Sequence, residues 1–320
     1  MRYNKFLKLI GDRYLDYRLE KSKGQEIYYI KINGKVSGFF ALLRMAVDYC
    51  CYADENGFLP YIKYDGDILY SENGIFLGTD NPFEYYFEQP TALSSFSDLK
   101  GINVIRIQSI HTEGIELRYN LKPLSYLAED MYIERMSEIY GKYIRLNTRT
   151  DNIINRGIRE LLKGKRTLGV HIRGTDFYKE FNNHPVPVTV DEYVKVIEGI
   201  IEQHHYEQVF VATDDIRCLK ELKRKMQIPL VFYKNVKRSE SNKSVAFELS
   251  ERKHDRYLLG LEILRDAYTL AACDSFVGCL SQVDIFVRII KMSKGQEFES
   301  LNIIDKGILR NNRECWEPRN

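Results

Sequence analysis

The chain has 320 residues, a length that suggests two domains of roughly 150 residues each. Its 47 Lys and Arg nearly balance its 45 Asp and Glu, which argues against a protein whose main role is to coat nucleic acid or an anionic membrane. A hydrophobic share of 44% excludes wholesale disorder. No apolar run approaches the roughly 18 residues of a membrane span, and the basic N-terminus lacks the apolar segment of a secretory signal. We therefore expect a cytoplasmic protein with at most peripheral membrane contact.

The six Cys show no paired short spacing, so neither a disulfide framework nor a zinc site is predicted. Reduced, mostly buried thiols are expected instead. The stretch 2–18 is basic with interleaved apolar residues, and an amphipathic helix packed on its own domain is favoured there over a membrane contact.

In the N-terminal half, residues 28–32 are predicted to form a strand, followed by a helix with apolar residues at spacings of three and four. Gly57 and Pro60 end this helix, and residues 61–64 are predicted as the next strand. Further on, most of the aromatic residues of 81–87 are expected in the core, although such rings also stack on sugars.

From residue 166 onward, short β-rich runs alternate with helical periods. Strands are predicted at residues 167–173, 208–212, 229–233, 275–279 and 302–305. Thr189 and Glu192 form a capping box at the start of one of the intervening helices. This alternation predicts an α/β protein with a parallel sheet, which binds ligands at the carboxyl ends of its strands. The most polar stretch, residues 237–244, is expected to be an exposed loop.

Candidate residues follow the first of these strands. His171 and Arg173 share one face of it, because side chains alternate along a strand. Gly174 permits a turn, and Asp176 can accept hydrogen bonds from the backbone within it. A guanidinium beside a tight turn suits a phosphate oxygen, and an Arg–Asp ion pair that closes the turn is the alternative.

Two further strand ends carry polar residues. Asp214 and Asp215 follow the next strand, where an Asp most often caps the following helix. Ser281 and Gln282 open a helix whose free N–H groups would suit a diphosphate. Plain capping of that helix, with Asp284 three residues after Ser281, is the alternative.

Asp266 falls on the apolar face of its predicted helix. A lone carboxylate there is costly without a partner. It is either a buried Asp paired with backbone or Arg, or a carboxylate that accepts from the N–H groups of a ligand such as guanine.

Two patterns in the N-terminal half also bear on ligands. Gly34 and Gly38 join a strand to a helix and allow close approach of backbone to a ligand. No GxGxxG or GxxxxGK[ST] sequence is present, so neither a dinucleotide fingerprint nor a Walker A loop is supported. Asp65 and Asp67 imitate the Asp-x-Asp motif that holds a metal ion in one architecture of glycosyltransferases, but a simple turn is favoured.

Three stretches carry a resemblance to a known family: VHIRGTD (170–176), VFVATDD (209–215) and SFVGCLSQVDIFVRII (275–290). In this order they resemble the signature stretches of GDP-fucose-dependent fucosyltransferases. The pattern is nearest to the α1,6-fucosyltransferases, including the rhizobial nodulation enzymes, with the protein O-fucosyltransferases further off. The resemblance covers about residues 166–295 and is looser over 34–60.

The resemblance implies the GT-B glycosyltransferase architecture of two Rossmann-like domains. Residues 1–163 would then bind an oligosaccharide or lipid-linked glycan acceptor, and residues 164–320 the GDP-sugar donor. It also implies transfer with inversion and without a metal or other cofactor, and no nucleic-acid partner.

Roles for individual residues follow from the same resemblance. Arg173 matches the arginine that holds the donor β-phosphate. The other matched donor-site residues are His171 and Asp266 around guanine and ribose, Asp214 and Asp215 as the acidic pair, Ser281 and Gln282 near the diphosphate, and Gly38 in the loop near the nucleotide. The catalytic base is chosen by position and not by resemblance: Glu180 lies just past the Arg173 turn, in a loop that could face the acceptor, and is the first candidate. Asp176 is the second, with a structural role as its alternative.

The chain departs from this pattern at Gly174, where the α1,6 enzymes carry a second arginine. The linkage, the acceptor and even the donor sugar are therefore left open. Two other readings also stay open: a non-catalytic GDP-sugar or glycan-binding protein on the same scaffold, and a metal-dependent transferase that uses Asp65 and Asp67.

Overall fold

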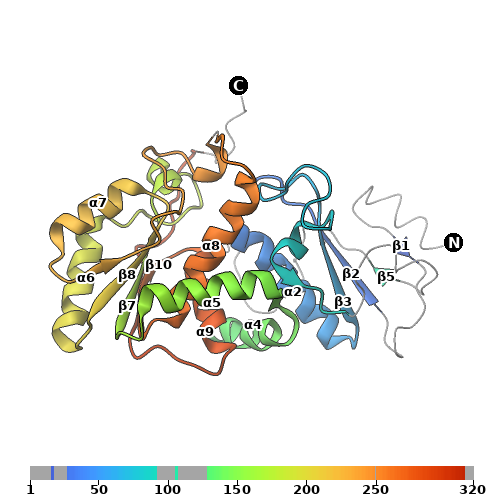
Figure 1. Ribbon diagram of the computed structural model, residues 1–320, viewed down its shortest axis with the longest axis horizontal. Helices are drawn as coiled ribbons and strands as arrows, with labels where there is room; N and C mark the ends of the chain where they lie inside the picture. The colour runs from blue at the N-terminus through green and yellow to red at the C-terminus, as the bar shows by residue number, and fades with distance from the viewer. Residues whose placement is uncertain (1–15, 18–26, 92–104, 107–127, 249, 314–320) are drawn as a thin grey trace. The chain divides into compact units, whose positions relative to one another are not determined.

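A computed structural model describes residues 16–17, 27–91, 105–106, 128–248 and 250–313 (Figure 1). The predicted amphipathic helix within 2–18 lies outside the described residues, apart from a two-residue strand. The chain forms two compact units, a first unit of Met1–Asn120 with Asp130–Asp151, and a second unit of Leu121–Glu129 with Asn152–Asn320. The expected domain boundary after residue 163 stays a prediction.

The first unit contains the predicted strand–helix–strand segment. Strand β2 (Ile27–Ile32) pairs in parallel with β3 (Leu59–Tyr64), and helix α2 (Phe39–Glu55) connects them. Its other elements are β1 (Asp16–Tyr17), η2 (Pro82–Tyr85), β4 (Phe87–Glu88), β5 (Ile105–Arg106), α4 (Asp130–Tyr143), β6 (Arg145–Leu146) and the start of α5 (Thr148–Leu162). The aromatic rings of 81–87 are buried, which confirms the prediction that they belong to the core.

The second unit is built on a five-stranded sheet with the order β11-β10-β7-β8-β9, and all its pairs are parallel. The strands are β7 (Thr167–Ile172), β8 (Gln208–Thr213), β9 (Leu230–Val231), β10 (Ser275–Cys279) and β11 (Leu301–Ile304). The predicted α/β class with a parallel sheet is therefore confirmed. The strand predicted at 229–233 is shorter than expected.

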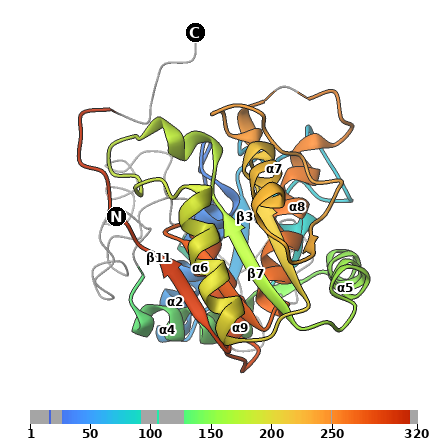
Figure 2. The same cartoon turned by 90° about the vertical axis from the view of Figure 1, so that its left-hand side faces the viewer.

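Helices cover both faces of this sheet. Apolar residues of α6 (Val190–Gln203) and α7 (Ile216–Lys225) share one core with alternate residues of β7 and β8. On the other face Gly169 of β7 lies against Leu270 of α8 (Asp255–Ala272), so closely that a Cβ at Gly169 would be 3.2 Å from its side chain. Figure 2 shows α6 and α7 in front of the sheet and α8 behind it.

The strand order places a topological switch point between β7 and β10. The chain moves from β7 to β8 and β9 on one side, then returns to add β10 and β11 on the other. In open parallel sheets the crevice for a ligand opens at the carboxyl ends of the two strands that flank this point. Arg173 directly follows β7, and Ser281 follows β10 after one residue, so two predicted candidates flank the switch point.

The polar stretch 237–244 is a loop whose residues 240–243 are exposed, as predicted, but one residue of it is not. Ser239 is fully buried, its N–H donates to the carbonyl of Asp214 at 2.8 Å, and its carbonyl accepts from the N–H of Ile216 at 3.0 Å. These two backbone hydrogen bonds attach the segment 237–244, called the pinned loop below, to the end of β8. Its polar side chains bond one another and the start of α7, a use that composition alone does not reveal.

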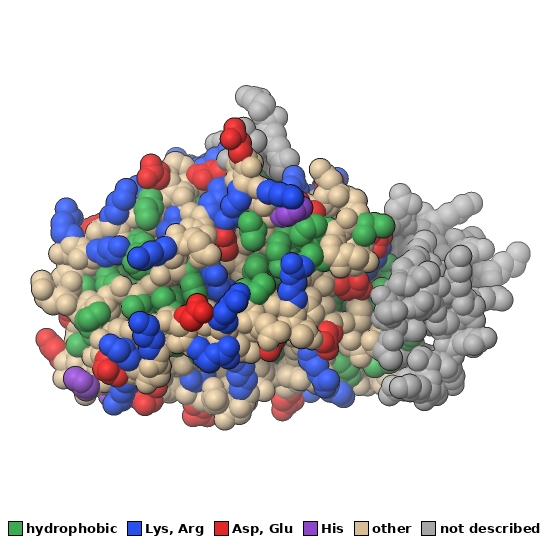
Figure 3. Space-filling model, viewed as in Figure 1, with side chains coloured by type: hydrophobic (Ala, Val, Ile, Leu, Met, Phe, Trp, Pro, Cys, Tyr) green, Lys and Arg blue, Asp and Glu red, His purple; other side chains and the backbone are tan. Residues whose placement is uncertain are grey.

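Charged side chains of both signs are interspersed over the face shown in Figure 3. Within the described ranges, no helix combines the length and apolar character that a membrane crossing requires. The described cysteines Cys50, Cys51, Cys218, Cys273 and Cys279 are buried free thiols, as expected from the sequence.

Candidate functional site

Arg173 is held between two carboxylates at the end of β7. Its guanidinium forms ion pairs with Asp214, which follows β8, and with Asp176 at 2.5 Å, which lies in the short helix η4 (Thr175–Lys179). The guanidinium also lies over the ring of Phe177, 5.0 Å from its centroid. The Arg–Asp pair that was the alternative to phosphate binding is thus present. An entering phosphate would share or replace these two carboxylates as the partner of Arg173.

The turn after Arg173 explains the glycine at position 174. The Gly174 N–H donates to Asp214 at 2.9 Å, and a Cβ at this position would be only 2.5 Å from the Cβ of Asp215. No larger side chain fits there without displacing the end of β8. Thr175, which follows, has a φ of 50° and donates its hydroxyl to Asp214 at 2.8 Å. Positive φ is unusual for a β-branched residue and marks local strain, which often accompanies function.

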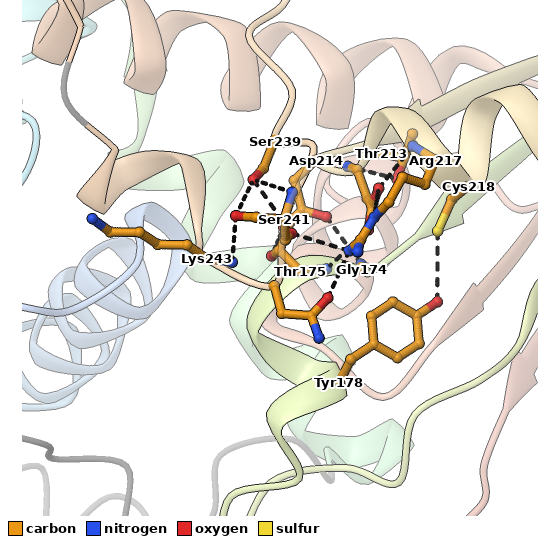
Figure 4. Close-up of polar contacts among 12 residues, drawn as sticks. Gly174, Thr175, Tyr178, Thr213, Asp214, Arg217, Cys218, Ser239, Ser241 and Lys243 are labelled. Atoms are coloured by element: carbon orange, nitrogen blue, oxygen red, sulfur yellow. Dashed lines mark hydrogen bonds and ion pairs between the residues drawn. The ribbon is translucent and has the colours of Figure 1, made fainter.

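Asp215 has a different role from its neighbour Asp214. It is fully buried and accepts from the backbone N–H of Arg217 at 2.8 Å, so it caps α7 as expected. Burial alone would raise its pKa, but hydrogen bonds from Arg217 outweigh burial and hold the pKa below its usual value. Arg217 also donates to Asn242 at 2.7 Å and to the carbonyl of Ser241 at 3.0 Å. Figure 4 shows Asp214 between the turn at Gly174 and Thr175 and the pinned loop at Ser239.

His171 forms a second polar pair on the other side of the switch point. Its Nδ1 lies 3.0 Å from both carboxylate oxygens of Asp284 in α9 (Gln282–Met292). Ser281 caps this helix by accepting from the N–H of Asp284 at 3.2 Å, which confirms the capping interpretation. Gly278 makes room for the carboxylate, because a Cβ there would collide with Asp284.

The sequence indicated only a capping role for Asp284. Its pairing with His171 joins residues 113 positions apart, so only the fold reveals it. Because a carboxylate accepts hydrogen bonds, Nδ1 of His171 is the donor in this pair. The pair therefore fixes the orientation of an imidazole at the end of β7.

Asp266 lies in α8 and is only 9% exposed, as the helical wheel predicts. Its Oδ1 is buried and has no hydrogen-bond partner among the described residues. Burial raises the pKa of Asp266 to about 7, and the nearby charges of Arg238 and Arg265 offset only part of this shift. A buried acceptor without a donor is costly, so this carboxylate is suited to a ligand that brings N–H groups.

The two candidate bases differ in their surroundings. Asp176 is engaged with Arg173 and also accepts from the hydroxyl of Thr175 at 2.9 Å. Glu180 is exposed and has a φ of 53°. Its N–H donates to the carbonyl of Phe177 at 3.1 Å and its carbonyl accepts from Asn311 at 2.8 Å, whereas its carboxylate has no hydrogen bond among the described residues. Glu180 is therefore the candidate whose carboxylate is available for a proton.

Gly38 lies in the first unit as the N-cap of α2. Its φ is −64°, which any residue adopts, and a Cβ built there would meet nothing within 4 Å. Open space beside this backbone is compatible with the close approach expected from the sequence. Gln282, the remaining candidate, begins α9 directly after Ser281.

Asp65 and Asp67 lie in a turn at the end of β3, as favoured from the sequence. Asp65 pairs with Lys31 at 3.2 Å and accepts from the N–H of Gly66, while Asp67 pairs with Lys35. In the part of the chain that the structure describes, no group of three or more His, Cys, Asp and Glu side chains is arranged to hold a metal ion.

The second unit thus has the layout of an open parallel α/β sheet, with Arg173 and the start of α9 at its switch point. Neither a protein-family model nor a curated protein matches the chain. Solved structures do. NodZ α-1,6-fucosyltransferase soaked with GDP-fucose is similar at 15% identity and a TM-score of 0.48, covering 83% of this chain and 93% of that one. POFUT1 in complex with GDP-fucose is similar at 11% identity and a TM-score of 0.49, covering 86% of this chain and 97% of that one.

Proposed function

We propose that the chain is a GT-B glycosyltransferase that moves L-fucose from GDP-fucose to a hydroxyl of a glycan acceptor, without a metal and with inversion at the sugar carbon. The observation that carries the proposal is the position of Arg173. It directly follows the central strand at the switch point, opposite the start of α9, where a diphosphate fits an open parallel sheet. The three signature-like stretches converge on this edge of the sheet.

The proposed reaction is a direct displacement. The acceptor oxygen forms a bond to C1 of fucose while the bond from C1 to the GDP oxygen breaks, and the acceptor proton passes to a base. Arg173 and the N–H groups at the start of α9 stabilise the charge that develops on the leaving diphosphate. His171 and Asp266 hold the ribose and guanine.

Glu180 is the proposed base, because its carboxylate is exposed whereas that of Asp176 is engaged with Arg173. The first unit is the proposed acceptor-binding domain, and an oligosaccharide or lipid-linked glycan is the proposed acceptor class. A cytoplasmic location belongs to the same proposal.

The test is calorimetric titration of GDP, ADP and UDP into the wild-type protein and Arg173→Ala, with EDTA present throughout. We expect GDP to bind selectively and Arg173→Ala to weaken that binding. With GDP-fucose and an acceptor, the same variant should lose about 10²–10³ in turnover, the effect of removing one donor to a developing negative charge. Arg166→Ala is the control, since it removes an arginine that precedes β7, at the opposite end of the same strand, and pairs with Glu299.

No binding of GDP, or binding only after a divalent ion replaces EDTA, would overturn the proposal. GDP-selective binding without any turnover over a wide acceptor screen would instead indicate the non-catalytic binding protein. Full turnover in Glu180→Gln would remove Glu180 as the base and leave the donor site intact.

A further inference from the structure

Arg238 is a half-buried arginine that the proposed mechanism does not use. It lies in the loop after β9, directly before Ser239, which forms a β-bridge with Asp215 at the end of β8. Nη1 of Arg238 donates to the carbonyls of Tyr233 and Val236 at 3.0 and 3.2 Å. Its Nε and Nη2 are buried without a hydrogen-bond partner among the described residues. The backbone bonds therefore fix the guanidinium and leave one of its edges unused.

The unused edge of Arg238 and the unpartnered oxygen of Asp266 belong to side chains whose charges act on each other. Burial holds the pKa of Arg238 below its usual value, although the negative charges of Asp266 and Glu262 act in the opposite direction. No ion pair or hydrogen bond joins the two side chains in the described structure. One buried acceptor and two buried donors, from different elements, are thus left unsatisfied. Tyr233 links the two elements, because its carbonyl accepts from Arg238 and its ring lies under the guanidinium of Arg265, the residue before Asp266 in α8. Leaving both unsatisfied is costly unless a ligand supplies the missing partners.

A 6-oxopurine has the matching pattern of groups. Guanine offers N–H donors at N1 and at its 2-amino group, and acceptors at O6 and N7 on the adjacent edge. Carboxylates accept from such N–H donors, and the fork of an arginine matches O6 and N7. Adenine reverses the pattern, because it has an amino group at position 6 and no hydrogen on N1.

We propose that Arg238 is a specificity residue for the donor nucleotide, with Nε and Nη2 binding O6 and N7 of guanine while Asp266 accepts from N1 and the 2-amino group. The inference rests on the proposed GDP-sugar site and assigns a residue outside its signature stretches. It also gives the pinned loop a purpose: Ser239 and Arg217 hold the segment from which Arg238 extends.

Arg265 offers a matched control for the charge. It also lies near Asp266, but its Nη2 donates to Asn235 at 2.9 Å and its guanidinium stacks on Tyr233 at 3.8 Å. Its Nε is the only part left buried without a partner in the described residues, so it lacks a free two-donor edge. Arg238→Lys and Arg265→Lys both keep the positive charge and lose the fork. They therefore separate electrostatic attraction from recognition of the base.

The experiment is calorimetric titration of GDP, 7-deaza-GDP, IDP and ADP into the wild type and both variants. 7-Deaza-GDP lacks the N7 acceptor, and IDP lacks the 2-amino group. We expect the wild type to bind 7-deaza-GDP about 10-fold more weakly than GDP, and ADP about 100-fold more weakly. In Arg238→Lys the affinity for GDP should fall about 10-fold and the penalty for 7-deaza-GDP should shrink to about twofold. Arg265→Lys should keep the wild-type penalty.

The outcomes separate the two proposals. Selective GDP binding with equal affinity for 7-deaza-GDP, or an unchanged penalty in Arg238→Lys, overturns the role of Arg238 and leaves the GDP site standing. Loss of the penalty in Arg265→Lys alone moves the role to Arg265. If the wild type does not bind GDP at all, the proposed function fails. Because the ligand series is read first in the wild type, the proposal can be rejected even if Arg238→Lys does not fold.

Discussion

Acidic residues follow a parallel strand in both units, yet the structure uses them in opposite ways. After β3, Asp65 and Asp67 lie in a turn and pair with the partly exposed Lys31 and Lys35. After β8, Asp214 and Asp215 are engaged in a largely buried network with arginines, a strained turn and a pinned loop. The difference comes from the surroundings and not from the local sequence. β8 lies beside the central strand of a five-stranded sheet, while among the described strands β3 pairs with β2 alone.

The largest effect on stability is expected from a methyl group in the turn at the end of β7. In Gly174→Ala the new Cβ would approach the Cβ of Asp215 to 2.5 Å, and overpacking of this kind costs about 3 kcal/mol. In Gly38→Ala the Cβ meets open space, so the change should stay within about 0.5 kcal/mol. Urea unfolding of both variants measures the contrast. Equal losses would show that the turn at Gly174 relaxes more readily than its contacts indicate.

The next largest effect on stability is expected when the buried Asp215 is removed, in comparison with the partly exposed Asp65. Asp215→Ala removes a helix cap and the buried partner of Arg217, which should lower the free energy of unfolding by about 2 kcal/mol at pH 7. Asp65→Ala removes a surface ion pair and should cost less than about 0.5 kcal/mol.

The pH dependence provides a check on Asp215. Its pKa is lowered in the folded state, so its contribution is present above about pH 4 and is lost as the pH falls below that value. The gap between the wild type and Asp215→Ala should therefore narrow in acid. A constant gap down to pH 3 would assign the loss to packing and not to the charged carboxylate.

A smaller effect is expected from Asp266, whose folded-state pKa of about 7 lies above its unfolded value. Its contribution to stability is full below about pH 4 and is lost as the pH rises towards 7, because the buried carboxyl must then ionise. Binding of guanine N–H groups requires the ionised form, so affinity for GDP should rise about 10-fold from pH 6 to pH 8. The two slopes are opposite in sign.

In Asp266→Asn, urea unfolding measures how stability depends on pH, and calorimetry measures how GDP affinity depends on pH. Titration of the GDP phosphate affects the wild type and the variant equally, so it cancels in the comparison. Both of the slopes assigned to Asp266 should disappear in the variant. The charged groups with a marked influence on this carboxyl are Arg238, Arg265, Glu262 and His171. An unchanged pH profile in Asp266→Asn would transfer the dependence to one of these neighbours.

The sequence predicted those features that depend on local periodicity. Strand β7, the capping box at Thr189 and the buried position of Asp266 follow from spacing alone, and the structure confirms them. The pairing of His171 with Asp284 could not be predicted, because it depends on which strand lies beside β7. The same holds for two residues of a polar stretch that suggested solvent exposure: Ser239 bonds backbone groups at the end of β8, and Arg238 donates to the carbonyl of Tyr233 after β9.

The smallest expected effect completes the comparison and tests the metal-dependent alternative. In the double variant Asp65→Asn, Asp67→Asn, turnover of GDP-fucose should stay within about twofold of the wild type, because exposed ion pairs contribute little and the proposed chemistry does not involve this turn. Addition of EDTA should leave both proteins equally active. A loss of turnover in the double variant, together with inhibition of the wild type by EDTA that Mn²⁺ or Mg²⁺ reverses, would move the catalytic role from Arg173 to the turn after β3. A divalent cation would then displace Lys31 and Lys35 from the two carboxylates. Asp65 and Asp67 would be the functional acidic pair, and Asp214 and Asp215 the structural one.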